Sequence, residues 1–235
     1  MLDRDPLPPT WRNRLYSELL TVTGELVRWS WRVVCAAGAI GPRTPTARRF
    51  GSFGDGTIVC FPFGSHVNLH AIHLGAGTVV NPGVTLSAGW MPDQPGLASR
   101  VLSIGDRCLI GRGSSIVAHQ SIEIGDDVWT GHHVHITDMN HGYEDLSVPI
   151  SRQYQPEAPV TIGDGSWLGH GVVVLPGARI GRHVVVGANS VVTGDLPDHS
   201  VAVGAPARVI KRLVPDGPTG AHGAEPEWRR EPVAD

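Results

Sequence analysis

Residues 162–212 read IGDGSWLGHGVVVLPGARIGRHVVVGANSVVTGDLPDHSVAVGAPARVIKR, and in this stretch an aliphatic residue returns every six positions. The members of this aliphatic column are Ile162, Leu168, Val174, Ile180, Val186 and Val192. A helix repeats about every 3.6 residues and an alternating strand about every two, so neither produces this pattern. A period of six instead indicates a short strand and a sharp turn in each repeat.

The column continues towards the N-terminus. Its further members are Ile104, Ile110 and Ile116, then, after two extra residues, Ile124, Thr130 and Ile136, and in a weaker block Leu74, Val80 and Leu86. Outside the weaker block, glycine follows eight of the twelve positions: Gly105, Gly111, Gly125, Gly131, Gly163, Gly169, Gly181 and Gly187. We attribute these glycines to the backbone conformation of the turns. Three strands then close one triangular coil, and stacked coils bury the column, so the sequence predicts an all-β, parallel β-helix.

Composition limits what the chain does. With 235 residues it is long enough for one large domain, and its net charge of −3 gives no basic field that calls for nucleic acid. Its 3 cysteines form no metal or redox motif, which is typical of a reducing cytoplasm. Charged residues and prolines precede any apolar run, so we expect no signal peptide, and no apolar stretch reaches transmembrane length. We therefore expect a cytoplasmic protein.

The two ends of the chain differ from the repeat. Over residues 1–50 we expect a helical extension, with Thr10 capping a helix that begins at Trp11 and continues to about Val34. Its Trp/Arg segment either packs on the fold or on a neighbouring subunit, which we favour, or touches a membrane surface. Residues 51–212 form the predicted β-helix, with an excursion around 138–160, and residues 213–235 lack periodicity and are predicted to be a disordered tail.

Residues 55–212 resemble the hexapeptide-repeat O-acetyltransferases, which include the galactoside and maltose acetyltransferases and enzymes that decorate polysaccharides. The resemblance rests mainly on DMNH at 138–141, on IGD-x-x-W-x-G at 162–169 and on GAPAR at 204–208. It implies a left-handed β-helix, a homotrimer with each active site between two subunits, and acetyl-CoA as cosubstrate. No metal is expected.

The resemblance also implies a catalytic residue. A hydroxyl that attacks a thioester needs a base to take its proton, and histidine suits this role. Among the 12 histidines, His141 matches the catalytic histidine of the family. Asp138 and Asn140 are candidates to orient its ring or to position the acceptor.

Five further residues match family positions that bind coenzyme A. Trp167 matches a tryptophan near the pantetheine arm, Ala188 a small residue where backbone groups hydrogen-bond this arm, and Thr193 a threonine that contacts coenzyme A. Arg208 and Lys211 match two basic residues that hold its phosphates.

The chain departs from the family at several positions. Gly111 and His119 replace an asparagine and an aspartate that bind the acceptor, and Gly194 and His170 replace a lysine and a serine. The donor half of the site is thus mostly kept, whereas the acceptor half differs, which argues against β-galactosides and maltose as substrates.

The sequence predicts an acetyl-CoA-dependent O-acetyltransferase that acts on a hydroxyl of a saccharide or glycan precursor. One alternative is N-acetylation of an amino sugar or nucleotide sugar. A different class is a zinc enzyme like the β-helical carbonic anhydrases, with ligands from His132, His133 and His135. These three histidines fall at different positions of the repeat and form no single column, so we favour the acyltransferase. A non-catalytic scaffold is disfavoured because His141, Trp167 and the basic pair are kept together.

Overall fold

The computed structural model describes residues 11–154, 156–216 and 227–232. The chain divides into two compact units, residues 1–38 and residues 39–235.

The first unit is one helix, α1, which begins at Trp11 and ends at Gly38. It continues four residues beyond the predicted end near Val34 and passes through Gly24 without a break. The predicted cap Thr10 lies outside the described residues. Large apolar side chains along the helix, such as Leu19, Leu26 and Trp29, are exposed. Within the described part of the chain, no helix combines the length and the apolar character that crossing a bilayer requires.

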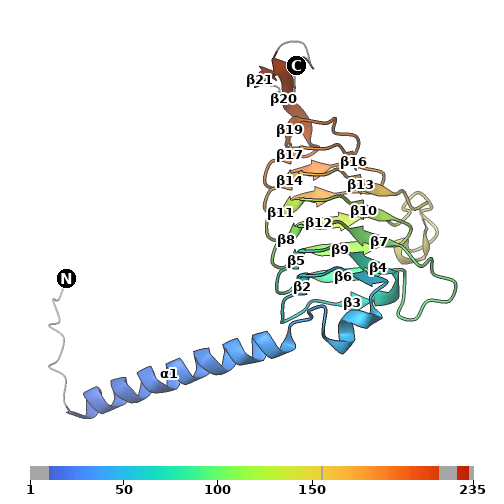
Figure 1. The fold of residues 1–235 in the computed structure, drawn as a ribbon. Coiled ribbons are helices and arrows are strands. Elements are labelled where there is room, and N and C mark those ends of the chain that lie inside the picture. The colour runs from blue at the N-terminus through green and yellow to red at the C-terminus, as the bar shows by residue number, and fades with distance from the viewer. Residues whose placement is uncertain (1–10, 155, 217–226, 233–235) are drawn as a thin grey trace, which may run out of the picture. The chain divides into compact units, whose positions relative to one another are not determined.

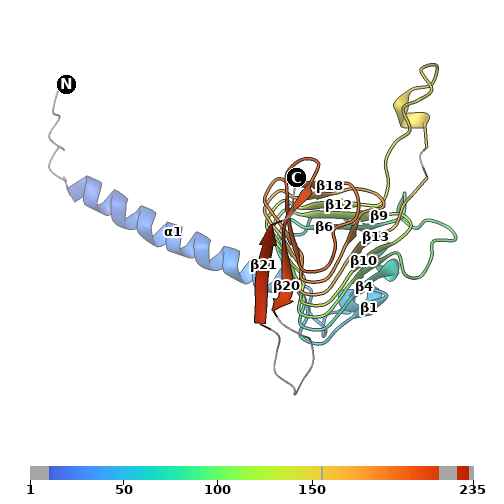
Figure 2. The ribbon, with the colours of Figure 1, turned by 90° about the horizontal axis from the view of Figure 1, so that it is seen from above.

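The second unit is a left-handed β-helix in which three sheets of short strands form the sides of a triangular prism (Figures 1 and 2). The first sheet contains β1 (Ser52–Phe53), β4 (Ile72–Leu74), β7 (Leu102–Ile104), β10 (Ile122–Ile124), β13 (Val160–Ile162) and β16 (Arg179–Ile180). The second contains β2 (Ile58–Val59), β5 (Val79–Val80), β8 (Leu109–Ile110), β11 (Trp129–Thr130), β14 (Trp167–Leu168), β17 (Val185–Val186), β19 (Ser200–Val203), β20 (Arg208–Asp216) and β21 (Glu227–Pro232). The third contains β3 (His66–Val67), β6 (Thr85–Ala88), β9 (Ser115–Ala118), β12 (His135–Thr137), β15 (Val173–Val174) and β18 (Val191–Val192). Three 3₁₀ helices, η1 (Pro45–Arg49), η2 (Leu69–Ala71) and η3 (Ile150–Arg152), interrupt the strands.

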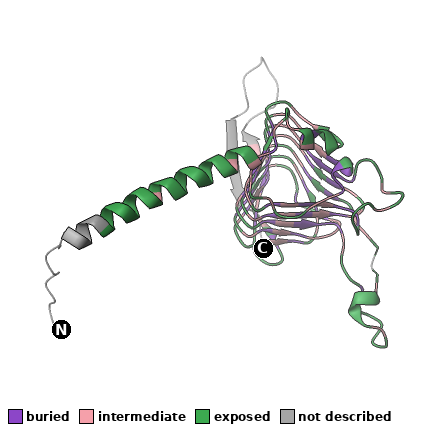
Figure 3. Ribbon diagram, turned by 90° about the horizontal axis from the view of Figure 1, so that it is seen from below, coloured by how far each residue is buried: buried purple, intermediate pink, exposed green. Residues whose placement is uncertain are grey.

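The predicted aliphatic column forms the core of the prism (Figure 3). All of its members are buried, from Leu74 in an early coil to Val192 in a late one. Parallel pairing places each member beside its counterpart in the next coil, for example Ile124 beside Ile162 and Leu168 beside Val186. The burial of aliphatic carbon in this shared interior is the main stabilising contribution, because a single coil buries little alone.

The glycines after the column have a different cause from the predicted one. None of these eight glycines has a positive φ; the left-handed residue is the second one after each glycine. Those left-handed residues are Arg107, Gly113, Asp127, His133, Gly165, Gly171, His183 and Asn189. At Gly111, a Cβ would fall on the carbonyl oxygen of Gly131 in the next coil, and at Gly131 it would come 2.6 Å from the backbone nitrogen of His170. The close approach of successive coils therefore requires the glycines.

Aspartates at equivalent turn positions, two in IGD segments and one in LPD at 196–198, join neighbouring coils. Asp126 Oδ1 accepts a hydrogen bond of 2.8 Å from the backbone N–H of Asp106. Asp164 repeats this contact towards Asp126 at 2.9 Å, and Asp198 towards Arg182 at 2.8 Å. A carboxylate that accepts from a backbone N–H satisfies a turn donor that the strands leave unpaired. These aspartates are thus part of the framework.

Two long excursions leave the prism. One lies between the end of β6 at Ala88 and the start of β7 at Leu102, and the other between the end of β12 at Thr137 and the start of β13 at Val160. The sequence predicted the second excursion and missed the first. The predicted disordered tail also differs from the structure, because β20 and β21 pair antiparallel over Lys211–Asp216 and Glu227–Pro232. The remaining tail residues, 217–226 and 233–235, lie outside the described residues.

Candidate active site

His141 lies at the base of the second excursion, where the chain has just left β12. The excursion begins and ends with main-chain pairing: His141 forms an isolated antiparallel bridge with Tyr154, and the N–H of Gly142 donates to the carbonyl of Gln153 at 3.2 Å. The side chains of His141 and Asn140 are exposed. An imidazole on a short paired segment is held at its backbone and stays open to a ligand, as a general base requires.

Asp138 has a different role from the predicted one. Its carboxylate is fully buried and accepts three hydrogen bonds of 2.8 Å from the backbone N–H groups of His119, Gln120 and Ser121. Both carboxylate oxygens are used in this way, and none of these bonds involves the ring of His141. Asp138 therefore fixes the turn after β9, which carries His119, and among the described residues no hydrogen bond joins its carboxylate to the His141 ring.

The turn after β9 belongs to a cluster that the sequence did not predict. Trp90, from the first excursion, lies against His119 with 4.1 Å between ring centroids. The indole N–H of Trp90 donates to Glu157 Oε1 at 3.0 Å, and Glu157 belongs to the second excursion. Tyr154, which pairs with His141 through the main chain, has its ring 5.6 Å from that of Trp90. The interruption of the six-residue register between Leu86 and Ile104 was the signal that would have located Trp90.

Several of the predicted coenzyme A residues follow one line on the second sheet. Trp167 is exposed and pairs in register with Val185, which pairs with Val201, which in turn pairs with Lys211. Arg208 is exposed at the start of the strand that contains Lys211. This line joins a flat apolar surface to two cations, a combination that suits an apolar arm ending in phosphates.

Ala188 and Thr193 lie outside this line. Ala188 is exposed in the turn that joins β17 to β18, and Thr193 is exposed directly after β18 in the third sheet. Within the described part of one chain, no hydrogen bond or ring contact joins His141 to Trp167, Arg208 or Lys211. The predicted donor and base residues are therefore not assembled by direct contact within one subunit.

Histidines gather at several corners of the prism. The rings of His132, His133 and His170 have centroids 5.5–6.5 Å apart. Among the described residues, no three His, Cys, Asp or Glu side chains are arranged to hold a metal ion. His135 faces outward from β12, and partial burial lowers the pKa of its imidazole. Burial also lowers the pKa of His119, while Asp138 and Glu157 act against this shift.

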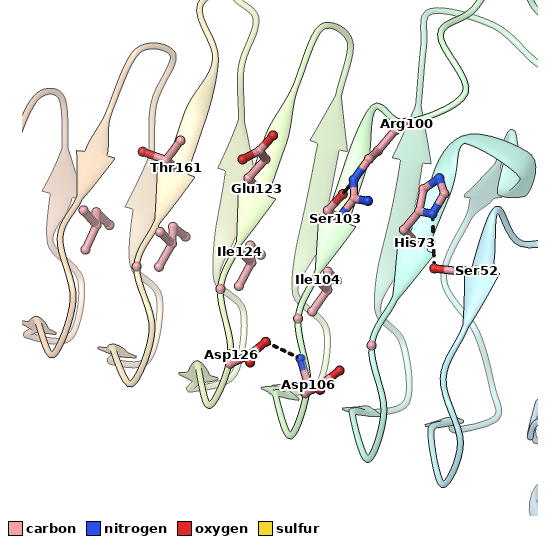
Figure 4. A pocket seen from close by; sticks show the side chains of 16 residues that line it. Ser52, His73, Arg100, Ser103, Ile104, Asp106, Glu123, Ile124, Asp126 and Thr161 are labelled. Carbon is pink, nitrogen blue, oxygen red and sulfur yellow. Dashed lines mark hydrogen bonds between the residues drawn. The ribbon is translucent and has the colours of Figure 1, made fainter.

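A shallow groove of about 550 Å³ crosses the outer side of the first sheet (Figure 4). Its lining is polar: Arg100 Nε donates to Ser103 Oγ at 2.7 Å, and His73 lies 3.1 Å from the hydroxyl of Ser52. Glu123 and Thr161 extend the lining along the same ladder. None of the residues predicted for catalysis or for coenzyme A lines this groove.

Of two glycines that depart from the family pattern, only Gly111 has a steric reason in the structure. Gly111 packs against the Gly131 carbonyl, so an asparagine does not fit there without moving a coil. Gly194 faces open space, so no steric contact excludes the lysine of the family pattern at this position.

Comparisons with known proteins agree with this architecture. The bacterial transferase hexapeptide family (six repeats) matches residues 159–194, and the hexapeptide repeat of succinyl-transferase matches residues 101–129. A probable acetyltransferase of Mycobacterium tuberculosis is 44% identical over 110 residues, which cover 47% of this chain and 37% of that protein. A putative lipopolysaccharide biosynthesis O-acetyltransferase of Escherichia coli K12 is 40% identical over 119 residues, covering 48% and 61%. A galactoside O-acetyltransferase of Lactococcus lactis is 39% identical over 108 residues, covering 43% and 52%.

The chain therefore spans between about a third and three fifths of the length of these relatives. Among solved structures, an N-acyltransferase from Bacillus cereus, crystallised with dTDP and coenzyme A, superposes with a TM-score of 0.62 over 73% of this chain and 89% of that one. Its sequence identity is 19%, so the likeness concerns the fold.

Proposed function

We propose that this chain, a left-handed β-helix protein of the hexapeptide-repeat acyltransferase family, transfers an acetyl group from acetyl-CoA to a hydroxyl of a saccharide or glycan precursor. The observation that carries the proposal is the placement of His141. Its imidazole is exposed on a paired segment at the edge of the coils that the family match covers. The identities of 39–44% to proteins named as acetyltransferases support the reaction class.

The transfer is direct. The acceptor hydroxyl oxygen attacks the thioester carbonyl carbon while the neutral imidazole of His141 takes the hydroxyl proton. The tetrahedral intermediate then collapses, the carbon–sulfur bond breaks, and the imidazolium returns the proton to the departing thiolate of coenzyme A. The products are an acetate ester and free coenzyme A thiol, and His141 ends as it began.

The donor is bound along the line that begins at Trp167. In this proposal the indole of Trp167 contacts the pantetheine arm, and the backbone around Ala188 and the side chain of Thr193 direct this arm towards the acceptor. Arg208 and Lys211 hold the phosphates, since exposed cations on one strand suit a polyanion.

The active chain is a homotrimer in this proposal. From β2 to β17 the outward residues of the second sheet are apolar, and Trp129 and Trp167 among them are large and exposed. Apolar surface of this extent favours a protein partner. In this assembly, a second copy packs along this sheet and brings its own His141 towards the line from Trp167 to Lys211. Within the described residues of one chain, His141 makes no hydrogen bond or ring contact with that line.

The exposed apolar residues of α1 fit the same assembly. Leu19, Val22, Leu26, Trp29 and Val33 follow one another at intervals of three and four residues. This is the spacing of a coiled-coil seam, so we propose that α1 packs on the equivalent helices of neighbouring subunits. Contact with a membrane surface is the alternative for this helix. A cytoplasmic location stays a prediction from the sequence.

A transfer assay tests the function. The purified chain is mixed with acetyl-CoA and a panel of sugars, amino sugars and nucleotide sugars, and released thiol and acetylated product are measured. The proposal predicts an ester on a sugar hydroxyl, which hydroxylamine cleaves. Formation of an amide alone would establish N-acetylation instead, and absence of thiol release with every acceptor would contradict the proposal.

A further inference from the structure

A cluster of four side chains connects the two excursions beside His141. Trp90 comes from the first excursion, Tyr154 and Glu157 come from the second, and His119 comes from the turn after β9. The mechanism above uses none of them. Ring contacts and a side-chain hydrogen bond link the four residues to one another.

Glu157 is held from one side only. Its Oε1 atom accepts the indole N–H of Trp90 at 3.0 Å and lies 3.6 Å from Nδ1 of His119. Within the described residues, no hydrogen bond reaches Oε2 of Glu157, although the side chain is only 27% exposed. A carboxylate has about four acceptor sites, so this one retains most of its capacity for a ligand.

The burial of the His119 side chain is energetically unfavourable. Its side chain is 7% exposed, and its Nδ1 atom is buried without a hydrogen-bond partner. Burial lowers the pKa of the ring, which favours the neutral form beside Glu157. Its backbone N–H is fixed by the buried Asp138. A buried polar atom that lacks a partner destabilises the fold, and such atoms are often kept at functional sites.

The two other members provide apolar surface. Trp90 is 44% exposed and Tyr154 is 78% exposed, and their rings meet edge to face. Tyr154 is also the main-chain partner of His141. Flat aromatic surface beside one oriented carboxylate is a combination found in binding sites, where apolar contact supplies affinity and a few polar groups fix orientation.

We propose that Glu157, Trp90 and Tyr154 form the acceptor wall of the active site. A pyranose-like ring lies against the two aromatic side chains, and one of its hydroxyls, other than the one that is acetylated, donates a hydrogen bond to Oε2 of Glu157. The Trp90 N–H is the positioning group that holds the carboxylate, and His119 packs against the Trp90 ring. This inference rests on the proposed function, because it orients an acceptor towards His141.

Glu157→Gln tests the wall, because the amide oxygen still accepts from Trp90 while the charge is lost. Glu144→Gln is the matched control, since Glu144 is an exposed carboxylate of the same excursion. A hydrogen bond to a charged group contributes about 1.5–3 kcal/mol, so we expect kcat/KM for the acceptor to fall about 10- to 150-fold in Glu157→Gln. The KM for acetyl-CoA and the thermal midpoint should stay unchanged, and the control should behave like wild type.

Deoxy analogues of the best acceptor separate recognition from structural damage. The analogue that lacks the contacted hydroxyl should be poor with the wild-type chain and no poorer with Glu157→Gln. A variant that keeps acceptor kcat/KM within about twofold, or loses the same factor with every deoxy analogue, would overturn the wall while the proposed function stands. If the wild-type chain neither binds a sugar, measured by calorimetry, nor acetylates one, the proposed function fails and the wall fails with it.

Discussion

Two of the three outer faces of the prism share one interior but differ in chemistry. The tryptophan face is the outer ladder of the second sheet: Ile58, Val79, Leu109, Trp129, Trp167, Val185 and Val201. The glutamate face is the outer ladder of the first sheet: Ser52, His73, Ser103, Glu123, Thr161 and Arg179. Every residue of the tryptophan face is apolar, and every residue of the glutamate face is polar or charged.

This difference shows which part of the repeat carries the fold. Apart from Thr130, the inward residues named in both sheets are aliphatic, and all of them are buried, as Ile162 and Leu168 are. Their outward neighbours differ in chemistry, since Thr161 is polar and Trp167 is a large aromatic residue. The outward positions are therefore free to follow what lies outside the coil. Water suits the glutamate face, whereas the tryptophan face requires a cover, which we assign to a neighbouring subunit and to the pantetheine arm.

A charge on each face gives the largest expected difference. Leu109→Asp places a carboxylate on the tryptophan face, away from Trp167, and should convert the trimer to monomers, because a buried unpaired charge is very costly. Thr161→Asp places the same group on the glutamate face and should leave the trimer intact. Sedimentation equilibrium decides between three chains of 25.0 kDa and one. A wild-type monomer at micromolar concentration, or a trimeric Leu109→Asp, would contradict the assignment of this face.

The shared interior is tested by removing carbon from it. Leu168 is fully buried, so Leu168→Ala should lower the free energy of unfolding by about 2–5 kcal/mol. Thr161→Ala, on the exposed side of the adjoining sheet, should change it by no more than about 0.5 kcal/mol. Urea unfolding followed by circular dichroism measures both. Equal losses would mean that the outer ladder contributes as much as the core.

The two cations of β20, which lie next to the end of the tryptophan face, are tested by removing them. Replacing Arg208 and Lys211 together with Ala should raise the KM for acetyl-CoA by about tenfold or more, with a smaller change in kcat, because phosphate contacts exist in both the ground state and the transition state. The defect should shrink with a shortened thioester that lacks the phosphates. A fall in kcat at constant KM would remove these residues from the donor site.

The sequence predicts the inward residues of the coils well and the residues outside the coils poorly. The inward column obeys a strict period, so residues such as Ile136 and Val186 were correctly placed in the core. Trp90 and Glu157 lie in excursions, where no period applies and only tertiary contact brings them together. Asp138 was assigned to the site by its motif, but its carboxylate serves the turn beneath His119. A motif identifies candidate residues, but it does not predict the contacts that each side chain makes.

The third sheet and the turn after it give the smallest expected effect. Burial lowers the pKa values of His66, His119 and His135, so the folded chain binds fewer protons than the unfolded chain near and below pH values of about 6.5. The contribution of these histidines to stability is present above that pH and is lost as the pH falls through it. His135→Gln should make the fall shallower, as urea unfolding at a series of pH values would show. An unchanged pH dependence in this variant would mean that His135 titrates alike in both states.

The proposed role of His141 as the general base for acyl transfer is tested by replacing it. General-base catalysis contributes about a hundred- to ten-thousand-fold, so His141→Ala should lower kcat by that factor, or about 3–5 kcal/mol of barrier. The variant must first be shown to form the wild-type oligomer and to bind acetyl-CoA with unchanged affinity. With those conditions met, we expect the roughly hundred- to ten-thousand-fold loss in kcat with the best acceptor. A correctly assembled His141→Ala that keeps about a tenth or more of wild-type turnover would contradict it, and another group would be the base.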